Sequence, residues 1–130
     1  MDQKLQNSLM NQFPELLLRD RGSMQFGIEC MNGWFDLIHD LCTHLDVELK
    51  RCQKLPDYDP ELAPRITTIK EKFGELRVYM SFESQRMSEL IEKASSDSRL
   101  TCEICGKPGT IDFSSKWYEC RCGRHCRRKS

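Results

Sequence analysis

The sequence predicts an α+β fold in which a central helix packs with a β-hairpin and a following helix, ahead of a small cysteine-rich module. An apolar stripe at helical spacing runs through residues 33–51. Two β-prone arms flank Gly74 within residues 65–81, an arrangement typical of a hairpin. Most of the cysteines gather near the C-terminus, in close pairs. We therefore expect an α+β domain at residues 1–98 and a small module with a basic tail at residues 99–130.

The composition limits the classes of protein that fit this chain. A length of 130 residues corresponds to one domain, or to one domain with a small appendage. The sequence has no apolar run of about 18 residues or more, so we expect no membrane-spanning helix. The first residues lack the apolar core of a secretory signal. We therefore expect a cytoplasmic protein in which Cys30, Cys42 and Cys52 are reduced and mostly buried.

Charge is unevenly distributed along the chain, although the formal net charge is zero. Residues 1–62 hold 11 acidic and 6 basic side chains, a balance of −5, so residues 63–130 carry +5. The basic side chains near the C-terminus are candidates for contacts with phosphate groups or with a partner; the alternative is a terminus that is basic only for solubility. These residues are Arg121, Arg124, Arg127, Arg128 and Lys129.

The N-terminal segment is predicted to be helical. Apolar residues recur at helical spacing through residues 3–19. Pro14 is expected to divide this stretch into two helical pieces, because proline is tolerated in the first turn of a helix but not in its interior. Residues 25–30 alternate in polarity, which predicts a brief strand or an extended entry to the next helix.

The stretch from residue 33 to residue 51 is the strongest helix in the sequence. Its apolar stripe includes Trp34 and Cys42, and Asn32 has a side chain suited to the N-cap. Three prolines within residues 53–64 predict a loop. The hairpin arms then follow, and helix is expected again over residues 83–98, where apolar residues return at helical spacing.

Two pairs of metal-binding side chains lie in the C-terminal module. Cys102 and Cys105 form the first pair, with Gly106 directly after it, and Cys122 and His125 form the second. Two close pairs of soft ligands at this separation are what a tetrahedral zinc ion requires. Four protein ligands leave no open position, so the sequence predicts a structural zinc ion in a knuckle or ribbon.

The second pair of ligands is ambiguous because two further cysteines flank it. Cys122 with His125 keeps the two-residue gap of a zinc knuckle, whereas Cys122 with Cys126 would make an all-sulfur site. Cys120 with Cys122 is cramped, since one residue separates the two. We favour His125 and keep Cys126 as the alternative.

Two aromatic residues, Trp117 and Tyr118, precede the second pair. We expect them to pack over the zinc, because a module this small has little else to bury. The alternative is an exposed aromatic surface which, together with the neighbouring arginines, could stack on nucleic-acid bases.

Signals for catalysis are weak. His39 and Asp40 invite comparison with metal-dependent phosphohydrolases, but the further ligands of such a site are not in recognisable places. The simpler interpretation puts His39, Asp40 and His44 on the solvated edge of the central helix. The sequence shows no phosphate-binding glycine loop, and no histidine lies between the two ligand pairs. We therefore predict a non-enzymatic protein, with a metal-dependent enzyme as the weakest alternative.

Three motifs resemble those of a family of small proteins from phages and bacterial genomes. Residues 26–38 resemble its ECGDGWxxLI opening, residues 69–79 its VKEKFGxLRFY hairpin, and residues 91–109 its IxxAExxSxxxCExCGxPG segment. That family closes with a tryptophan followed five residues later by Cys-x-x-His or Cys-x-x-Cys, and the spacing after Trp117 matches. The resemblance implies His125 as the fourth ligand, a related fold, and a phage or mobile-element context.

The resemblance spans roughly residues 26–126 and implies no activity. It draws attention to the turn at residues 70–74, because core packing does not explain the charged residues there. The alternative for this segment is a hairpin held by Phe73 with a glycine turn.

Taken together, these features favour a zinc-containing protein-binding module, for example a phage factor that engages or inhibits a host protein machine. A nucleic-acid-binding zinc ribbon that uses the basic tail with Trp117 or Tyr118 is the alternative.

Overall fold

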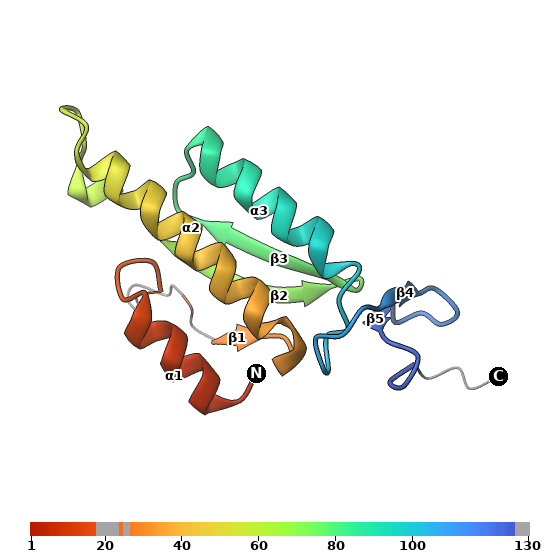
Figure 1. Ribbon diagram of the computed structural model, residues 1–130. Helices are drawn as coiled ribbons and strands as arrows, with labels where there is room; N and C mark the ends of the chain where they lie inside the picture. The colour runs from red at the N-terminus through yellow and green to blue at the C-terminus, as the bar shows by residue number, and fades with distance from the viewer. Residues whose placement is uncertain (18–23, 25–26, 127–130) are drawn as a thin grey trace.

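The structure is a computed structural model that describes residues 1–17, 24 and 27–126, and it confirms the α+β class. Helices and a three-stranded sheet form the larger part of the molecule, and a two-stranded sheet lies near the C-terminus (Figure 1). The elements are α1 (Gln3–Gln12), β1 (Ile28–Glu29), the 3-10 helix η1 (Asn32–Trp34), α2 (Phe35–Gln53), η2 (Pro60–Leu62), β2 (Ile66–Lys72), β3 (Glu75–Met80), α3 (Gln85–Ser98), β4 (Thr110–Asp112) and β5 (Glu119–Arg121).

The larger sheet has the strand order β1-β2-β3. Strand β1 runs parallel to β2, with Ile28 opposite Ile69, and β3 is antiparallel to β2. Helices α2 and α3 lie side by side over this sheet, and α1 lies next to β1 (Figure 1). Leu76 and Val78 of β3 are buried in the core, whereas Tyr79, the residue after Val78, is exposed. This alternation is typical of a sheet with one buried face.

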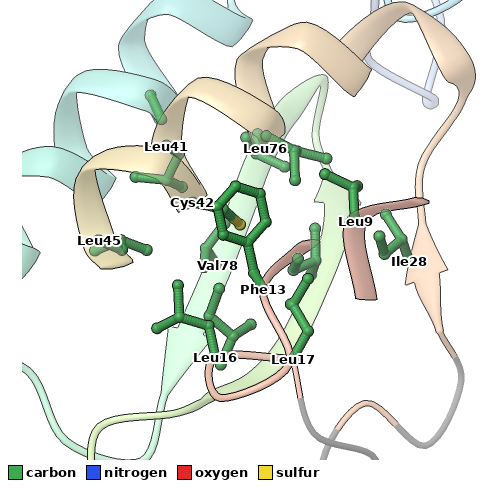
Figure 2. Packing of buried hydrophobic residues seen from close by; sticks show 14 of the residues in the cluster. Leu9, Phe13, Leu16, Leu17, Ile28, Leu41, Cys42, Leu45, Leu76 and Val78 are labelled. Carbon is green, nitrogen blue, oxygen red and sulfur yellow. The ribbon is translucent and has the colours of Figure 1, made fainter. Parts of the chain in front are cut away.

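One hydrophobic core joins the helices to the sheet. The side chains of Leu9 and Phe13, from α1 and the residue after it, point into the same cluster as Leu41, Cys42 and Leu45 of α2 (Figure 2). Cys42 is fully buried among these residues, as its place on the predicted apolar stripe indicated. Within the described part of the chain, no helix is long and apolar enough to cross a membrane.

Two of the predicted helix boundaries were wrong. The central α-helix begins at Phe35, because a turn of 3-10 helix occupies Asn32–Trp34. Asn32 therefore makes no N-cap bond to α2. Its side chain instead accepts a hydrogen bond from the Asp2 N–H. Helix α1 ends at Gln12, and Pro14 begins a turn rather than a second helical piece in the described residues up to 17. Residues 18 and 19 of that predicted piece lie outside the described residues.

The hairpin formed as predicted, with a two-residue turn of Phe73 and Gly74. Both turn residues have positive φ, +55° at Phe73 and +80° at Gly74, and the Glu71 carboxylate accepts a hydrogen bond of 2.7 Å from the Gly74 N–H. Positive φ at both central positions defines the tight turn that suits the twist of a hairpin. Glycine adopts this conformation freely, but a phenylalanine there is an outlier.

Helix α3 covers part of the open edge of β3 through two serine hydroxyl groups. The Ser98 Oγ accepts a hydrogen bond of 2.9 Å from the Leu76 N–H, and the Ser95 Oγ donates one of 2.8 Å to the Leu76 carbonyl. These contacts satisfy backbone groups that an edge strand otherwise leaves unpaired.

We expect Ser98→Ala to lower the free energy of unfolding by about 1–3 kcal/mol, because the buried Leu76 N–H loses its acceptor. Urea unfolding followed by circular dichroism measures this change. Ser96→Ala is the matched control, since Ser96 is exposed on the same helix. Equal stabilities for the two variants would contradict the role given to Ser98.

Candidate metal centre

The structure brings Cys102, Cys105, Cys122 and His125 together. The four ligand atoms lie within 4.8 Å of one another. Cys102 and Cys105 come from the turn after α3, and Cys122 and His125 come from the turn that follows β5. Strands β4 and β5 pair between these two turns and so set the distance that separates the ligand pairs.

The spacing of the ligand atoms fits a tetrahedral metal ion. Two sulfurs bound to one zinc ion at the usual bond length are about 3.8 Å apart, and a sulfur and a nitrogen about 3.6 Å apart. The Sγ atoms of Cys105 and Cys122 are 3.7 Å apart. The His125 Nδ1 lies 3.7 Å from the Cys102 Sγ and 3.2 Å from the Cys122 Sγ. Three sulfurs and one imidazole nitrogen form a donor set typical of structural zinc sites.

Backbone N–H groups prepare Cys102 to act as a thiolate ligand. Burial acts to raise its pKa, but hydrogen bonds from the backbone outweigh this effect and lower the pKa of Cys102 to about 6. The donors belong to Cys122, Cys105 and Ile104. The Gly106 N–H, at a residue with φ of +79°, closes the same turn on the Cys102 carbonyl at 2.9 Å. A metal ion binds the deprotonated form, so this environment favours coordination.

The two flanking cysteines point away from the cluster. The Cys120 thiol is fully buried in the core and donates to the Arg99 carbonyl at 3.3 Å. Burial raises its pKa, which disfavours the thiolate form. The Cys126 Sγ lies 3.8 Å from an Asp112 carboxylate oxygen. This arrangement supports His125 over Cys126 as the fourth ligand.

The first ligand turn packs directly against η1, the 3-10 turn that precedes α2. The Gly33 N–H donates to the Glu103 carbonyl at 2.7 Å, and the indole N–H of Trp34 donates to the Thr101 carbonyl at 2.9 Å. Trp34 is fully buried. The candidate metal centre is therefore tied by hydrogen bonds to the larger part of the fold.

A buried ion pair lies beneath the ligand turns. The side chains of Arg121 and Glu103 are 7% and 6% exposed, and their nearest atoms are 3.3 Å apart. Burial raises the pKa of Glu103, while the Met31 N–H and the Arg121 guanidinium oppose the rise. The sequence grouped Arg121 with the surface cations, and this was wrong, because its guanidinium compensates a carboxylate inside the molecule.

We expect Arg121→Met to lower the free energy of unfolding by about 3–5 kcal/mol, since it leaves the Glu103 carboxylate buried without its cation. The neighbouring Arg124 is exposed, so Arg124→Met is the matched control and should change stability by less than about 0.5 kcal/mol. Urea unfolding distinguishes them. An Arg121→Met variant that is as stable as the Arg124→Met control would show that the ion pair contributes little to the free energy of unfolding.

Four exposed aromatic side chains, which we call the aromatic cluster, come from the β2–β3 turn and from the loop between β4 and β5, at the end of these two strands opposite the ligand turns. The Tyr118 ring lies 4.9 Å from the Phe113 ring and 6.3 Å from the Phe73 ring, between centroids. Phe73 is 59%, Phe113 62%, Trp117 74% and Tyr118 38% exposed. The prediction that Trp117 packs over the zinc was therefore wrong. The loop between β4 and β5 carries Trp117 outward, and Tyr118 packs on the rings of Phe73 and Phe113.

The remaining predicted site residues fall into three places. Arg124 is exposed, while the tail residues Arg127, Arg128 and Lys129 lie outside the described residues. His39 stacks on Phe35 at 6.1 Å between centroids, at the edge of α2. Within the described ranges, Asp40 and His44 join no group of three or more potential metal ligands.

Sequence reasoning missed two features of this region. Glu103 lies within the first ligand pair and gave a usable signal, because a charged residue at this position has to point either to solvent or to a cation. Phe113 gave no signal, since nothing in its local pattern places it against Tyr118. Tyr118 in turn contacts Phe73 of the hairpin turn, 45 residues away in sequence, and only the fold brings these rings together.

Comparison of the chain with protein-family models, with curated protein sequences and with solved structures found no match.

Proposed function

We propose that this chain is a non-enzymatic protein-binding module whose cysteine–histidine cluster holds one structural zinc ion. The observation that carries the proposal is the exposed aromatic cluster of Phe73, Phe113, Trp117 and Tyr118. Contiguous exposed apolar surface of this kind marks interaction sites in small proteins. Aromatic side chains are also the commonest anchors of protein–protein interfaces.

The backbone at Phe73 supports an interaction role for the cluster. This residue has a φ of +55° and an exposed ring, so neither turn geometry nor core packing accounts for a phenylalanine here. A hairpin turn of this kind ordinarily carries asparagine or aspartate at this position. Strained residues of this sort gather at binding sites, because function selects the side chain against the local preference.

The candidate metal centre supports a structural role for zinc. Cys102, Cys105, Cys122 and His125 supply four ligands, which leaves no position for a reacting water molecule. The two ligand turns hold β4 and β5, and the loop between these strands carries Phe113, Trp117 and Tyr118. The zinc ion would thus stabilise the loop that presents the aromatic cluster. The resemblance of the three sequence motifs to phage and bacterial proteins supports our proposal that the partner belongs to a host machine.

Native mass spectrometry of complexes captured by the full chain from a bacterial lysate tests this proposal. Nuclease treatment removes partners bridged by nucleic acid. We expect a protein bound at a fixed stoichiometry, retained by Leu100→Ala and lost from a Phe113→Ser, Trp117→Ser double variant. Leu100 is the matched control because it is an exposed apolar residue outside the cluster. Absence of any such protein, or equal capture by both variants, would contradict the proposal.

Nucleic acid is the second candidate partner, favoured by the exposed Arg124 beside the basic C-terminal residues and by Trp117 as a stacking surface. This alternative predicts capture of nucleic acid instead of protein, and an affinity that falls steeply with salt concentration.

A further inference from the structure

The four ligands of the candidate metal centre are unequally exposed. Cys102 and Cys122 are buried and His125 is half-buried, whereas Cys105 is exposed to solvent. All eight cysteines of the chain lie within the described residues, and Cys105 alone among them is exposed. A reagent that arrives from solvent therefore meets the sulfur of Cys105 before any other cysteine sulfur.

A bound zinc ion would make this exposed sulfur a nucleophile. Zinc binds the deprotonated form of cysteine, so a zinc-loaded chain presents Cys105 as a thiolate. The rate at which a peroxide oxidises a cysteine follows its thiolate character and its exposure. Cys52 and Cys126 are half-buried and are not among the four ligands, so no metal keeps their sulfurs deprotonated. Cys105 combines both conditions for oxidation.

A second sulfur lies close enough to complete a disulfide bond. The Sγ of Cys122, from the other ligand turn, is 3.7 Å from the Sγ of Cys105. A disulfide bond is about 2.0 Å long, so these two sulfurs have to move only about 1.7 Å closer.

The third sulfur of the cluster is held more firmly. Three backbone N–H groups, two of them in its own turn, donate hydrogen bonds to the buried Sγ of Cys102. Such bonds stabilise a thiolate and lower its nucleophilicity. Cys122 is therefore the better placed of the two buried cysteines to attack an oxidised Cys105.

We propose that Cys105 is a site of oxidation by hydrogen peroxide, and that this oxidation expels the zinc ion by joining Cys105 to Cys122. In the first step the Cys105 thiolate attacks one peroxide oxygen; an S–O bond forms, the O–O bond breaks, and hydroxide leaves. In the second step the Cys122 thiolate attacks the sulfur of the Cys105 sulfenic acid; the S–S bond forms, the S–O bond breaks, and a second hydroxide leaves. Two thiolates thus give two electrons to one peroxide molecule, and the zinc ion keeps its charge.

Release of the metal follows from the number of ligands that remain. Only Cys102 and His125 are left to bind it, whereas a structural zinc ion requires four ligands. A disulfide and a sulfenic acid are both reversible, so a thiol reductant together with zinc should restore the site. The inference rests on the zinc ion of the proposed function, does not depend on the protein partner, and adds a modification site with its reagent.

Treatment of the full-length, zinc-loaded chain with limiting hydrogen peroxide tests this inference. A colorimetric zinc chelator follows release of the metal, and peptide mapping by mass spectrometry locates the oxidised cysteines. We expect one zinc ion released for each Cys105–Cys122 disulfide formed. When dimedone, which traps sulfenic acids, is present, we expect its first adduct on Cys105.

Two variants separate oxidation at Cys105 from oxidation elsewhere. Cys105→His keeps four ligands, as two sulfurs and two nitrogens, a set that also holds structural zinc. This variant should release zinc about tenfold or more slowly than the wild type, because its exposed thiolate is gone. Cys126→Ser is the matched control: it removes a half-buried thiol outside the ligand set and should release zinc at the wild-type rate. Zinc content measured before peroxide is added shows whether each variant has an intact site, and dimedone labelling of the wild type needs no variant.

Three outcomes on a zinc-loaded chain would overturn the inference. A first dimedone adduct on a cysteine other than Cys105 would do so, as would a disulfide between Cys102 and Cys105 in place of Cys105–Cys122. Equal rates of release from a zinc-loaded Cys105→His variant and from the wild type would do so too. A chain that takes up no zinc overturns the zinc site of the proposed function together with this inference, whereas a zinc-loaded chain that resists peroxide overturns this inference alone.

Discussion

Removal of the metal from the Cys102, Cys105, Cys122 and His125 cluster is expected to unfold residues 99–126 and to destabilise the whole chain. Structural zinc ions supply on the order of 10 kcal/mol of folding free energy in small zinc modules, which is comparable to the full stability of a typical domain. The C-terminal segment buries few large apolar side chains of its own. Without the ion, the main contacts that remain between its two turns are the Arg121–Glu103 pair and the pairing of β4 with β5.

Single substitutions of the cysteines make this expectation specific. Cys122→Ser should abolish metal binding and lower the melting temperature sharply, because it removes one of four ligands. Cys126→Ser should leave both unchanged, since the Cys126 thiol faces Asp112 instead of the cluster. Thermal unfolding followed by circular dichroism, with and without a strong chelator, measures the effect. An unaltered melting temperature in the chelator, or equal loss in the two variants, would contradict a Cys3His site.

The second large effect is expected from Gly33→Ala, at the contact between η1 and the first ligand turn. A Cβ atom at Gly33 would lie 2.2 Å from the Cys102 carbonyl oxygen and 2.5 Å from that of Glu103. Both are backbone atoms, so no side-chain rotation relieves the clash. The ligand turn would have to move, which would also break the hydrogen bond from the Gly33 N–H to Glu103.

We expect this substitution to lower the free energy of unfolding by about 3 kcal/mol or more, at the upper end of the range for overpacking. It should also weaken metal binding, because Cys102 is itself a ligand. Gly123→Ala is the matched control: it lies in the second ligand turn, and a Cβ atom there meets nothing within 4 Å. Urea unfolding and metal content of both variants provide the measurement. A stable, fully metal-loaded Gly33→Ala protein would show that the two parts of the fold are not coupled here.

The sequence predicted the larger elements well where one physical signal dominated. The apolar stripe of α2 extends over five turns, so its period is unmistakable, and the β-prone arms around Gly74 leave few alternatives to a hairpin. The ends of helices were less well predicted. Asn32 has the side chain of an N-cap residue, but packing of the neighbouring Gly33 against Glu103 places a 3-10 turn there instead.

The metal ligands could be predicted from the sequence, but the positions of the residues around them could not. Metal ligands fall at short, regular spacings, so Cys102 and Cys105 are visible in the sequence itself. The burial of Arg121 depends on Glu103, a partner 18 residues away, and the exposure of Trp117 depends on a loop conformation. Neither has a local signature. The surroundings of the site therefore required the fold.

The central claim of this account is that three sulfurs and one nitrogen of this chain hold a single zinc ion. X-ray absorption at the zinc edge, on protein purified from bacteria without added metal, tests it most directly. We predict one zinc per chain with three sulfur neighbours at about 2.3 Å and one nitrogen at about 2.0 Å. A protein without zinc, or a zinc ion with four sulfurs or with a bound water molecule, would contradict the account.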